Sequence, residues 1–166
     1  MRPSKTLLFR LIPLVTMLGV VVALLLWWSS IGQREQAIDF RLPTLDGEWV
    51  SLSALQGEPV LFTFFLSRCP DCNRETAYFN DIYENYRESH SLNVLGIGIG
   101  EEIEEFAERN AVLYPVLLDT SMEVARAYGV SRVPHTVLVD RQGRVAASYS
   151  TPLSYEELND ALQMIL

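Results

Sequence analysis

Residues 60–72 read VLFTFFLSRCPDC and carry the only two cysteines of this 166-residue chain, Cys69 and Cys72. The apolar run Val60–Leu66 is typical of a central strand that is covered on both faces. The segment that follows Cys72, as far as Tyr86, has helical periodicity. A strand that delivers Cys-x-x-Cys to the first turn of a helix is a redox arrangement, because the positive end of the helix stabilises a thiolate on the first cysteine.

Two plainer interpretations of the cysteine pair are a zinc site and a purely structural disulfide. A four-ligand zinc site would need two more ligands, and the only histidines, His90 and His135, lack paired spacing. A disulfide between Cys69 and Cys72 would close so short a loop that it would restrict the unfolded chain little. We therefore favour a redox-active pair, and we expect no metal ion and no bound cofactor.

The N-terminal segment has the character of a membrane anchor. The 21 residues of Leu11–Ile31 carry no charge, and at about 1.5 Å per residue they span the roughly 30 Å of a bilayer core. Basic residues precede this stretch and acidic ones follow it, which places the N-terminus in the cytoplasm. A cleaved signal peptide is the alternative, but its only candidate cleavage site, at 29–32, is weak. We expect residues 1–32 to be a cytoplasmic tip and single-pass transmembrane helix of a bacterial inner membrane, with residues 33–166 forming one domain on the periplasmic side.

The remainder of the chain is strongly acidic. Ten of the 13 basic residues and all 21 acidic residues lie beyond Gln33, which gives this part a net charge of −11. Such a charge argues against nucleic acid and against an anionic membrane surface as partners. Simple solubility explains the charge, and steering toward a basic partner is the alternative.

Strand and helix patterns alternate along the acidic part. Short alternating segments at 40–42 and 50–52 predict a small hairpin, with a turn between them. Further strands are expected at 92–99, 116–118, 136–139 and 145–149, and helices at 73–86, 101–110, 121–128 and from Ser154 onward. On the first of these helices the residues expected to face the core are Ala77, Tyr78, Ile82, Tyr83 and Tyr86. The order of elements predicts an α/β sheet, parallel at its centre, with helices on both faces.

Four stretches of sequence, in this order, resemble those of a known family. They are an opening hairpin (39–57), an active-site strand and turn (64–72), a later strand (114–119), and a proline loop with a hairpin (128–143). From residue 37 to the C-terminus the chain thus resembles the membrane-anchored, thioredoxin-like TlpA/ResA/CcmG group of the AhpC/TSA-redoxin family. Cys-x-x-Cys alone is a weak signal, but Val-Pro-x-Thr at 133–136 makes it strong. The resemblance implies a thioredoxin fold with an N-terminal β-hairpin and a central strand–helix insertion, here Leu92–Asn110.

The resemblance also implies roles for residues near the cysteines. Val133–Pro134 is expected to be a cis peptide packed against the sulfurs, with a backbone that pairs with an extended substrate segment; a trans turn proline is the alternative. Glu75 lies one helical turn beyond Cys72. It is expected to take a proton from Cys72 or to raise the pKa values of the thiols, unless it is only a solvated helix charge.

Two positions leave the substrate of such a site open. Arg68 stands where many relatives have tryptophan, and we expect it to stabilise a Cys69 thiolate or to meet an acidic substrate, although Asp71 opposes the first effect. His135, next to Pro134, either lines the site or is a plain surface histidine.

Together these features predict a membrane-tethered, extracytoplasmic thiol–disulfide oxidoreductase. In this prediction Cys69 attacks a protein disulfide, and Cys72 resolves the mixed disulfide with the help of Glu75. The resemblance implies a reductant, with apocytochrome c as a candidate substrate and a transmembrane thiol carrier as electron donor. Two rivals are a peroxiredoxin-type peroxidase, which needs a hydroxyl residue where Leu66 stands, and a copper-delivery metallochaperone, which separates its cysteines by three residues rather than two.

Overall fold

The computed structural model describes residues 17–24 and 34–166. Residues 17–24 are helical, and Glu35–Leu166 belong to one compact unit. Most of the anchor predicted at 11–31 lies outside the described residues. Within the two described ranges, no helix combines the length and the apolar character needed to cross a bilayer.

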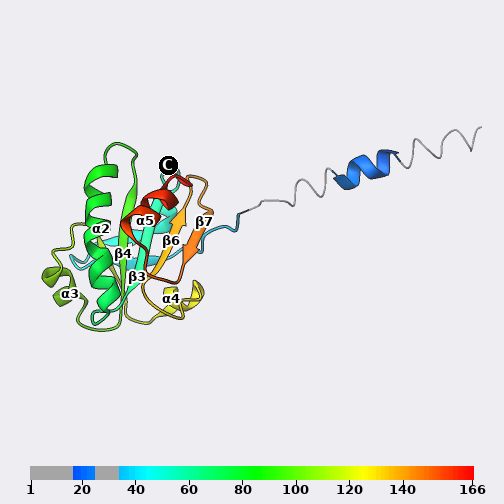
Figure 1. Ribbon diagram of the computed structural model, residues 1–166. Helices are drawn as coiled ribbons and strands as arrows, with labels where there is room; N and C mark the ends of the chain where they lie inside the picture. Colours follow the sequence, from blue (N-terminus) through cyan, green and yellow to red (C-terminus); the bar gives the residue numbers. More distant parts are fainter. Residues whose placement is uncertain (1–16, 25–33) are drawn as a thin grey trace, which may run out of the picture. The chain divides into compact units, whose positions relative to one another are not determined.

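A five-stranded sheet in the order β5-β4-β3-β6-β7 forms the centre of the compact unit (Figure 1). The strands are β3 (Val60–Phe65), β4 (Asn93–Ile99), β5 (Val116–Asp119), β6 (His135–Val139) and β7 (Val145–Tyr149). The β3, β4 and β5 strands run parallel, whereas β6 and β7 pair antiparallel. Every residue of β3 is buried, which confirms its predicted central place. Its apolar run fits this place because both faces of a central strand are removed from water.

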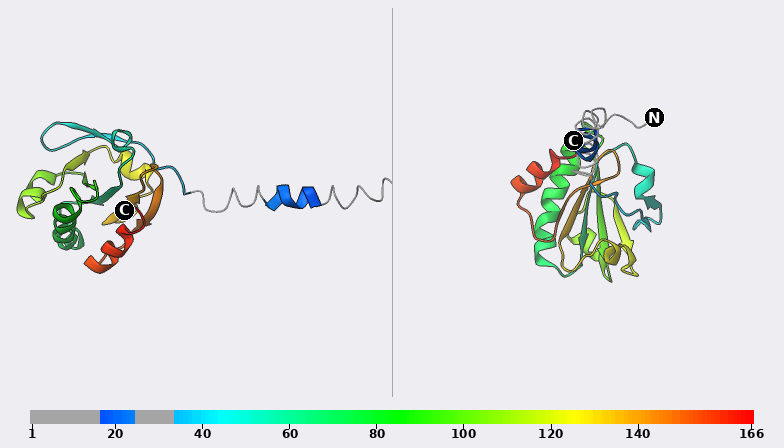
Figure 2. Two further views of the ribbon diagram at one scale, coloured as in Figure 1. Left: turned by 90° about the horizontal axis from the view of Figure 1, so that it is seen from above. Right: turned by 90° about the vertical axis from the view of Figure 1, so that its right-hand side faces the viewer.

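Helices cover both faces of the sheet, as predicted (Figure 2). One face packs against α2 (Pro70–Tyr86) and α5 (Tyr155–Leu162) through a cluster of buried side chains that includes Leu61, Phe79, Leu138 and Leu158. The other face packs against α4 (Glu123–Ala127), the 3₁₀ helix η1 (Leu52–Leu55) and the hairpin of β1 (Arg41–Pro43) and β2 (Trp49–Ser51). The hairpin confirms the predicted one to within a residue.

The buried side of α2 differs in part from the predicted one. Ile82 is buried as expected, and the three tyrosines are partly buried against the core, but Ala77 is exposed. The buried stripe instead begins at Cys72 and continues through Glu75, Thr76 and Phe79. Because successive helical residues are rotated by about 100°, Ala77 lies on nearly the opposite side of the helix from this stripe.

Two glycines of β4 allow the inserted helix α3 (Ile103–Arg109) to pack directly on the sheet. A Cβ atom on Gly98 would lie 2.4 Å from Cγ2 of Ile103, closer than two carbons can approach. A Cβ atom on Gly96 would lie 3.0 Å from the rings of both Phe65 and Tyr114. The alternating glycines of this strand therefore make room for α3 and for the Tyr114 ring on the face that also carries α2.

Candidate active site

Cys69 and Cys72 lie where the chain passes from β3 to α2, as the sequence predicts. Cys69 is the N-cap residue of α2, and its Sγ accepts a hydrogen bond from the Cys72 amide at 3.1 Å. The two cysteines form a disulfide, with their Cα atoms 5.2 Å apart. Cys72 is only 3% exposed, whereas Cys69 is half-buried. Cys69 is therefore the sulfur that a visiting thiol or disulfide can reach.

The loop before β6 brings a proline to the two sulfurs. Val133–Pro134 is a cis peptide, which confirms that expectation. The carbonyl oxygen of Val133 lies 4.0 Å from the Sγ of Cys69, and Pro134 lines the same small cavity as Cys72. The backbone of this loop is thus within reach of a chain that approaches Cys69.

Glu75 is a buried carboxyl behind the disulfide. It is 3% exposed; its Oε1 accepts a hydrogen bond of 2.5 Å from the amide of Leu153, while its Oε2 has no partner among the described residues. Burial raises the pKa of Glu75 to about 7, and the charge of Asp71 adds to this, while the Leu153 amide and Arg74 oppose it. A carboxyl with such a pKa can exchange a proton near neutral pH.

Cys72 and Glu75 both line a cavity of about 10 Å³. This is about the space that one water molecule occupies. The other residues lining it are Thr63, Phe65, Thr76, Phe79, Tyr114 and Pro134. Sequence reasoning missed Thr76, Phe79 and Tyr114 as site residues, although Tyr114 belongs to one of the family motifs. It also missed the Leu153 amide, which is 78 residues from Glu75 and has no local sequence signal.

His135 takes neither of the two positions predicted for it. It is 5% exposed, and its Nε2 and Nδ1 lie 3.0 Å from the hydroxyl oxygens of Ser148 and Ser150. Its ring packs edge-on against Phe64, on the sheet face opposite α2. Because successive side chains of a strand point to opposite faces, the residue that follows, Thr136, reaches the α2 face while His135 points away from the cavity. Burial lowers the pKa of His135.

Arg68 lies next to Cys69 in the chain, but its guanidinium group is bound to Glu102. Its Nη2 and Nε donate to the two carboxylate oxygens of Glu102 at 2.7 and 3.0 Å. This pairing raises the pKa of Arg68 and lowers that of Glu102. Asp71, which was expected to oppose the effect of Arg68, forms an ion pair with Arg74. In this disulfide form Arg68 thus pairs with Glu102, and its expected effect on a Cys69 thiolate or on an acidic substrate stays a prediction.

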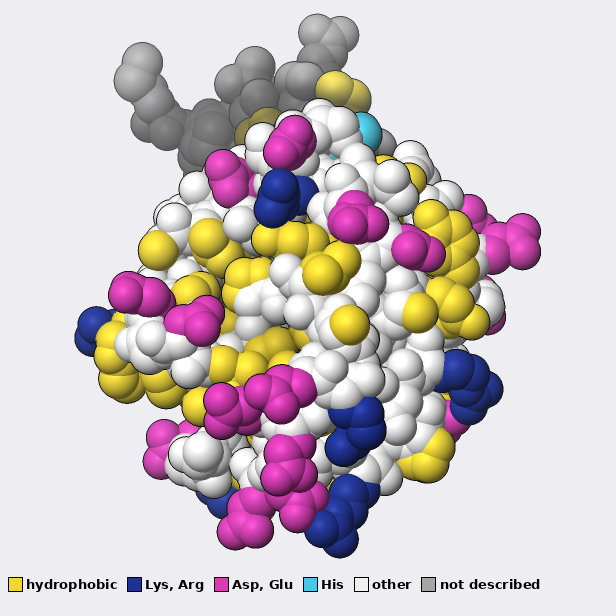
Figure 3. All heavy atoms as spheres, turned by 90° about the vertical axis from the view of Figure 1, so that its left-hand side faces the viewer, with side chains coloured by type: hydrophobic (Ala, Val, Ile, Leu, Met, Phe, Trp, Pro, Cys, Tyr) yellow, Lys and Arg dark blue, Asp and Glu magenta, His cyan; other side chains and the backbone are white. Residues whose placement is uncertain are grey.

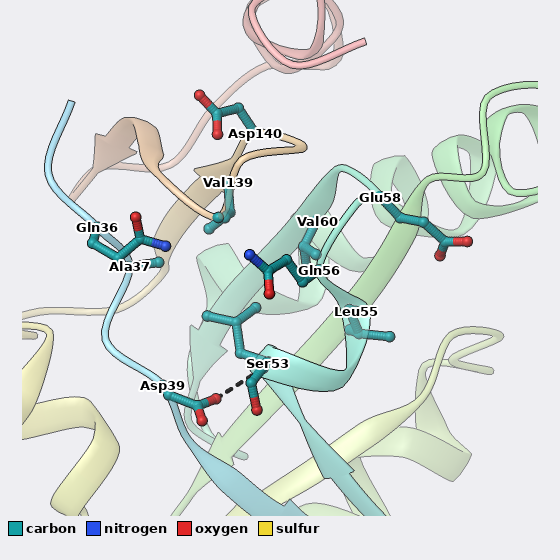
Figure 4. A pocket seen from close by; sticks show the side chains of 12 residues that line it. Gln36, Ala37, Asp39, Ser53, Leu55, Gln56, Glu58, Val60, Val139 and Asp140 are labelled. Carbon is teal, nitrogen blue, oxygen red and sulfur yellow. Dashed lines mark hydrogen bonds between the residues drawn. The ribbon is translucent and has the colours of Figure 1, made fainter. Parts of the chain in front are cut away.

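A larger pocket, of about 180 Å³, lies far from the cysteines (Figure 4). Its lining includes the first residue of β3, Val60, and the last residue of β6, Val139, so it lies at the other end of the sheet. Asp39 borders it and accepts a hydrogen bond from the Ser53 amide at 2.9 Å. Neither cysteine lines this pocket. Within residues 17–24 and 34–166, no three His, Cys, Asp or Glu side chains are grouped so that they could hold a metal ion.

Comparison with known proteins agrees with this geometry. The model of the AhpC/TSA family matches residues 33–148. The thiol-disulfide oxidoreductase ResA of Geobacillus thermodenitrificans is 30% identical over 140 residues, which are 82% of this chain and 80% of that protein. The ResA protein of Bacillus subtilis is 27% identical over 173 residues, which cover 99% of this chain and 96% of the relative.

Solved structures share the architecture. A Chlorobium tepidum structure assigned as the thiol:disulfide interchange protein DsbE matches with a TM-score of 0.73 and 25% identity, over 81% of this chain and 97% of that one. A Bacteroides thetaiotaomicron structure assigned as a protein disulfide isomerase matches with a TM-score of 0.71 and 27% identity, over 78% of this chain and 86% of that one. The fold is thioredoxin-like, and the chain belongs to the AhpC/TSA family as a member of its TlpA/ResA/CcmG group.

Proposed function

We propose that this protein is a thiol–disulfide oxidoreductase that reduces disulfides in other proteins. One observation carries the proposal: the disulfide at the start of α2 presents the Cys69 sulfur beside the Val133 carbonyl and keeps Cys72 buried near Glu75. The relatives named thiol-disulfide oxidoreductase ResA support this activity.

The reaction consists of two exchanges of sulfur–sulfur bonds. The Cys69 thiolate attacks one sulfur of the substrate disulfide, forms a mixed disulfide with it and releases the other substrate sulfur as a thiolate. The Cys72 thiolate then attacks the Cys69 sulfur, which restores the Cys69–Cys72 bond and releases the second substrate thiolate. The substrate gains two electrons and, at neutral pH, two protons. The half-buried position of Cys69 and the burial of Cys72 fit this order of attack.

Glu75 supplies the base for the second exchange in this proposal. Cys72 must lose its proton before it can attack, and burial without a base would hold it as a thiol. Glu75 lines the same cavity as Cys72, and its Oε2 is unpartnered among the described residues. A carboxyl with a pKa of about 7 can take that proton and then pass it on. The backbone at Val133 would pair with the substrate chain as an added strand does.

We further propose that residues 1–32 anchor residues 33–166 to a bacterial inner membrane, with the redox domain on the periplasmic side. The uncharged stretch Leu11–Ile31, with basic residues before it and acidic residues after it, supports this placement. Disulfides persist in the periplasm, so a pair that works as a reductant there needs a supply of electrons. A transmembrane thiol carrier is the proposed donor, and apocytochrome c before haem attachment is the proposed substrate.

Trapping of the mixed disulfide tests the activity. In cells that express the full chain with Cys72→Ser, substrates should remain bound to Cys69, because the resolving sulfur is missing. We expect adducts that vanish on reduction and that are absent from the matched Cys69→Ser variant. If the two variants give the same pattern, or if neither gives adducts, the proposed activity is wrong.

A further inference from the structure

The inserted segment Leu92–Asn110 forms hydrogen bonds on both sides of the cysteine pair. Nη2 of Arg109 donates a hydrogen bond to the carbonyl oxygen of Ser67 at 2.9 Å, just before the cysteine pair. Nδ2 of Asn110 donates to Oδ1 of Asn73 at 3.1 Å, just after the pair. In Figure 1, α3 lies beside the end of α2 where that helix begins. The position of α3 therefore bears directly on the surroundings of Cys69.

The strongest of these contacts is the ion pair between Arg68 and Glu102. The Nε–Nη2 edge of the guanidinium binds both carboxylate oxygens, at 3.0 and 2.7 Å, and this two-bonded arrangement fixes direction as well as distance. The Arg68 side chain is 82% exposed, so packing does little to hold it in place. Glu102, which directly precedes α3, thus determines where the positive charge next to Cys69 lies.

Besides Arg68, three arginines lie on the segments next to Cys69: Arg74, Arg109 and Arg132. Arg74 forms an ion pair with Asp71. Arg109 donates a hydrogen bond to the Ser67 carbonyl, and its charge helps to lower the pKa of Glu102. The face that carries α3 shows more acidic than basic side chains, and several of the basic ones lie beside acidic ones (Figure 3). The charged residues on the elements next to Cys69 are Arg68, Asp71, Arg74 and Glu75 on its own segment, Glu101, Glu102, Glu105 and Arg109 on the inserted segment, and Arg132 on the proline loop.

We propose that Glu102 is a positioning residue for the redox reaction: it holds the Arg68 guanidinium off the Cys69 sulfur and so keeps the cysteine pair a stronger reductant. A cation beside the sulfur would stabilise the thiolate. A stabilised thiolate favours the dithiol over the disulfide, which makes the pair more oxidising. This inference rests on the proposed oxidoreductase function and adds that the Arg68–Glu102 pair helps to set the reduction potential of the two cysteines.

Charge-removing variants of the full chain, kept in detergent, test the inference. The set is Glu102→Gln, Arg68→Gln, the double variant, and Glu101→Gln as the matched control, which removes a neighbouring exposed charge that has no hydrogen bond to Arg68. The first readout is the pH dependence of Cys69 alkylation by iodoacetamide in the reduced protein. The second is the equilibrium in which the protein disulfide and two glutathione thiols give the dithiol and glutathione disulfide, a two-electron exchange.

We expect Glu102→Gln to lower the pKa of Cys69 by about half a unit at low ionic strength, since it releases a cation next to the sulfur. At a pH high enough to deprotonate Cys69 in both proteins, this shift moves the glutathione equilibrium about threefold toward the dithiol, which corresponds to about 15 mV. In the Arg68→Gln background, the same substitution should have no more effect than Glu101→Gln.

Three results would overturn the inference: no shift in Glu102→Gln, an equal shift in Glu101→Gln, or an undiminished shift when Arg68 is already replaced. The last two would mean that Glu102 acts on Cys69 directly through its charge. Failure of the proposed function is distinguishable, because it would appear as an absence of trapped adducts in the Cys72→Ser chain. Hydrogen exchange of the α3 amides in all variants shows whether α3 has stayed in place.

Discussion

Glu75→Gln should change how the stability of the oxidised protein depends on pH. The carboxyl has an ordinary pKa of 4.5 in the unfolded chain and of about 7 in the folded one, chiefly because burial disfavours its charged form. The folded state therefore holds this proton over a pH range in which the unfolded state has released it. Stability from Glu75 is fully present below about pH 4.5 and is lost as the pH rises through about 7.

The expected magnitude follows from the two pKa values. At 1.36 kcal/mol for each pKa unit, the ionised Glu75 side chain should destabilise the folded state by about 3 kcal/mol above neutral pH. Glutamine has nearly the same shape, can still accept the Leu153 hydrogen bond through its amide oxygen, and does not ionise. Any folding stability that is lost by burying the glutamine amide is the same at every pH, because the amide does not ionise. The difference in stability between the variant and the natural chain should therefore move in favour of glutamine by about 3 kcal/mol between about pH 4 and pH 8.

Urea unfolding of the oxidised full chain and of its Glu75→Gln variant at a series of pH values measures this difference. Other titrating groups are common to both proteins and cancel in the comparison. Glu84→Gln, at an exposed position of the same helix, is the control for the removal of one charge. A difference that stays constant across this pH range would refute the assignment of Glu75 as a buried carboxyl with a raised pKa.

Two further predictions test the surroundings of the site. Gly98→Ala should destabilise the fold by roughly 1–3 kcal/mol and loosen α3, because the new Cβ would lie 2.4 Å from Ile103. Urea unfolding measures the change in stability, and hydrogen exchange of the α3 amides measures the loosening. An unchanged stability would contradict the packing of α3 on the sheet. The His135 imidazole should titrate below its ordinary pKa of 6.5, because burial disfavours its charged form. The stability that depends on neutral His135 is therefore present above about pH 6.5 and is lost as the pH falls through the lowered pKa. NMR of the ring protons measures this pKa, and a value at or above 6.5 would count against the burial of His135 between Ser148 and Ser150.

Much of the fold could be predicted because its signals are local. The apolar run of β3, the hairpin signals and the helical periodicities each depend on residues a few positions apart, and the structure places these elements within a few residues of the predicted bounds. The error at Ala77 arose because several apolar residues follow one another on α2, so their order alone did not decide which side of the helix is buried. The polar members of that side, Glu75 and Thr76, were not recognised as core residues.

The chain alone determined the chemistry of the site: two cysteines separated by two residues at a predicted strand-to-helix junction, with Val-Pro-x-Thr farther along, indicate sulfur exchange. Only the tertiary structure decided which residues meet around the two sulfurs. The Leu153 amide binds Glu75, which is 78 residues away in the sequence, and Glu102 binds Arg68, which is 34 residues away. The alternation of side chains along β6 points His135 away from the cavity. Contacts of this kind depend on how helices and strands pack against one another, and no short-range pattern of residues encodes them.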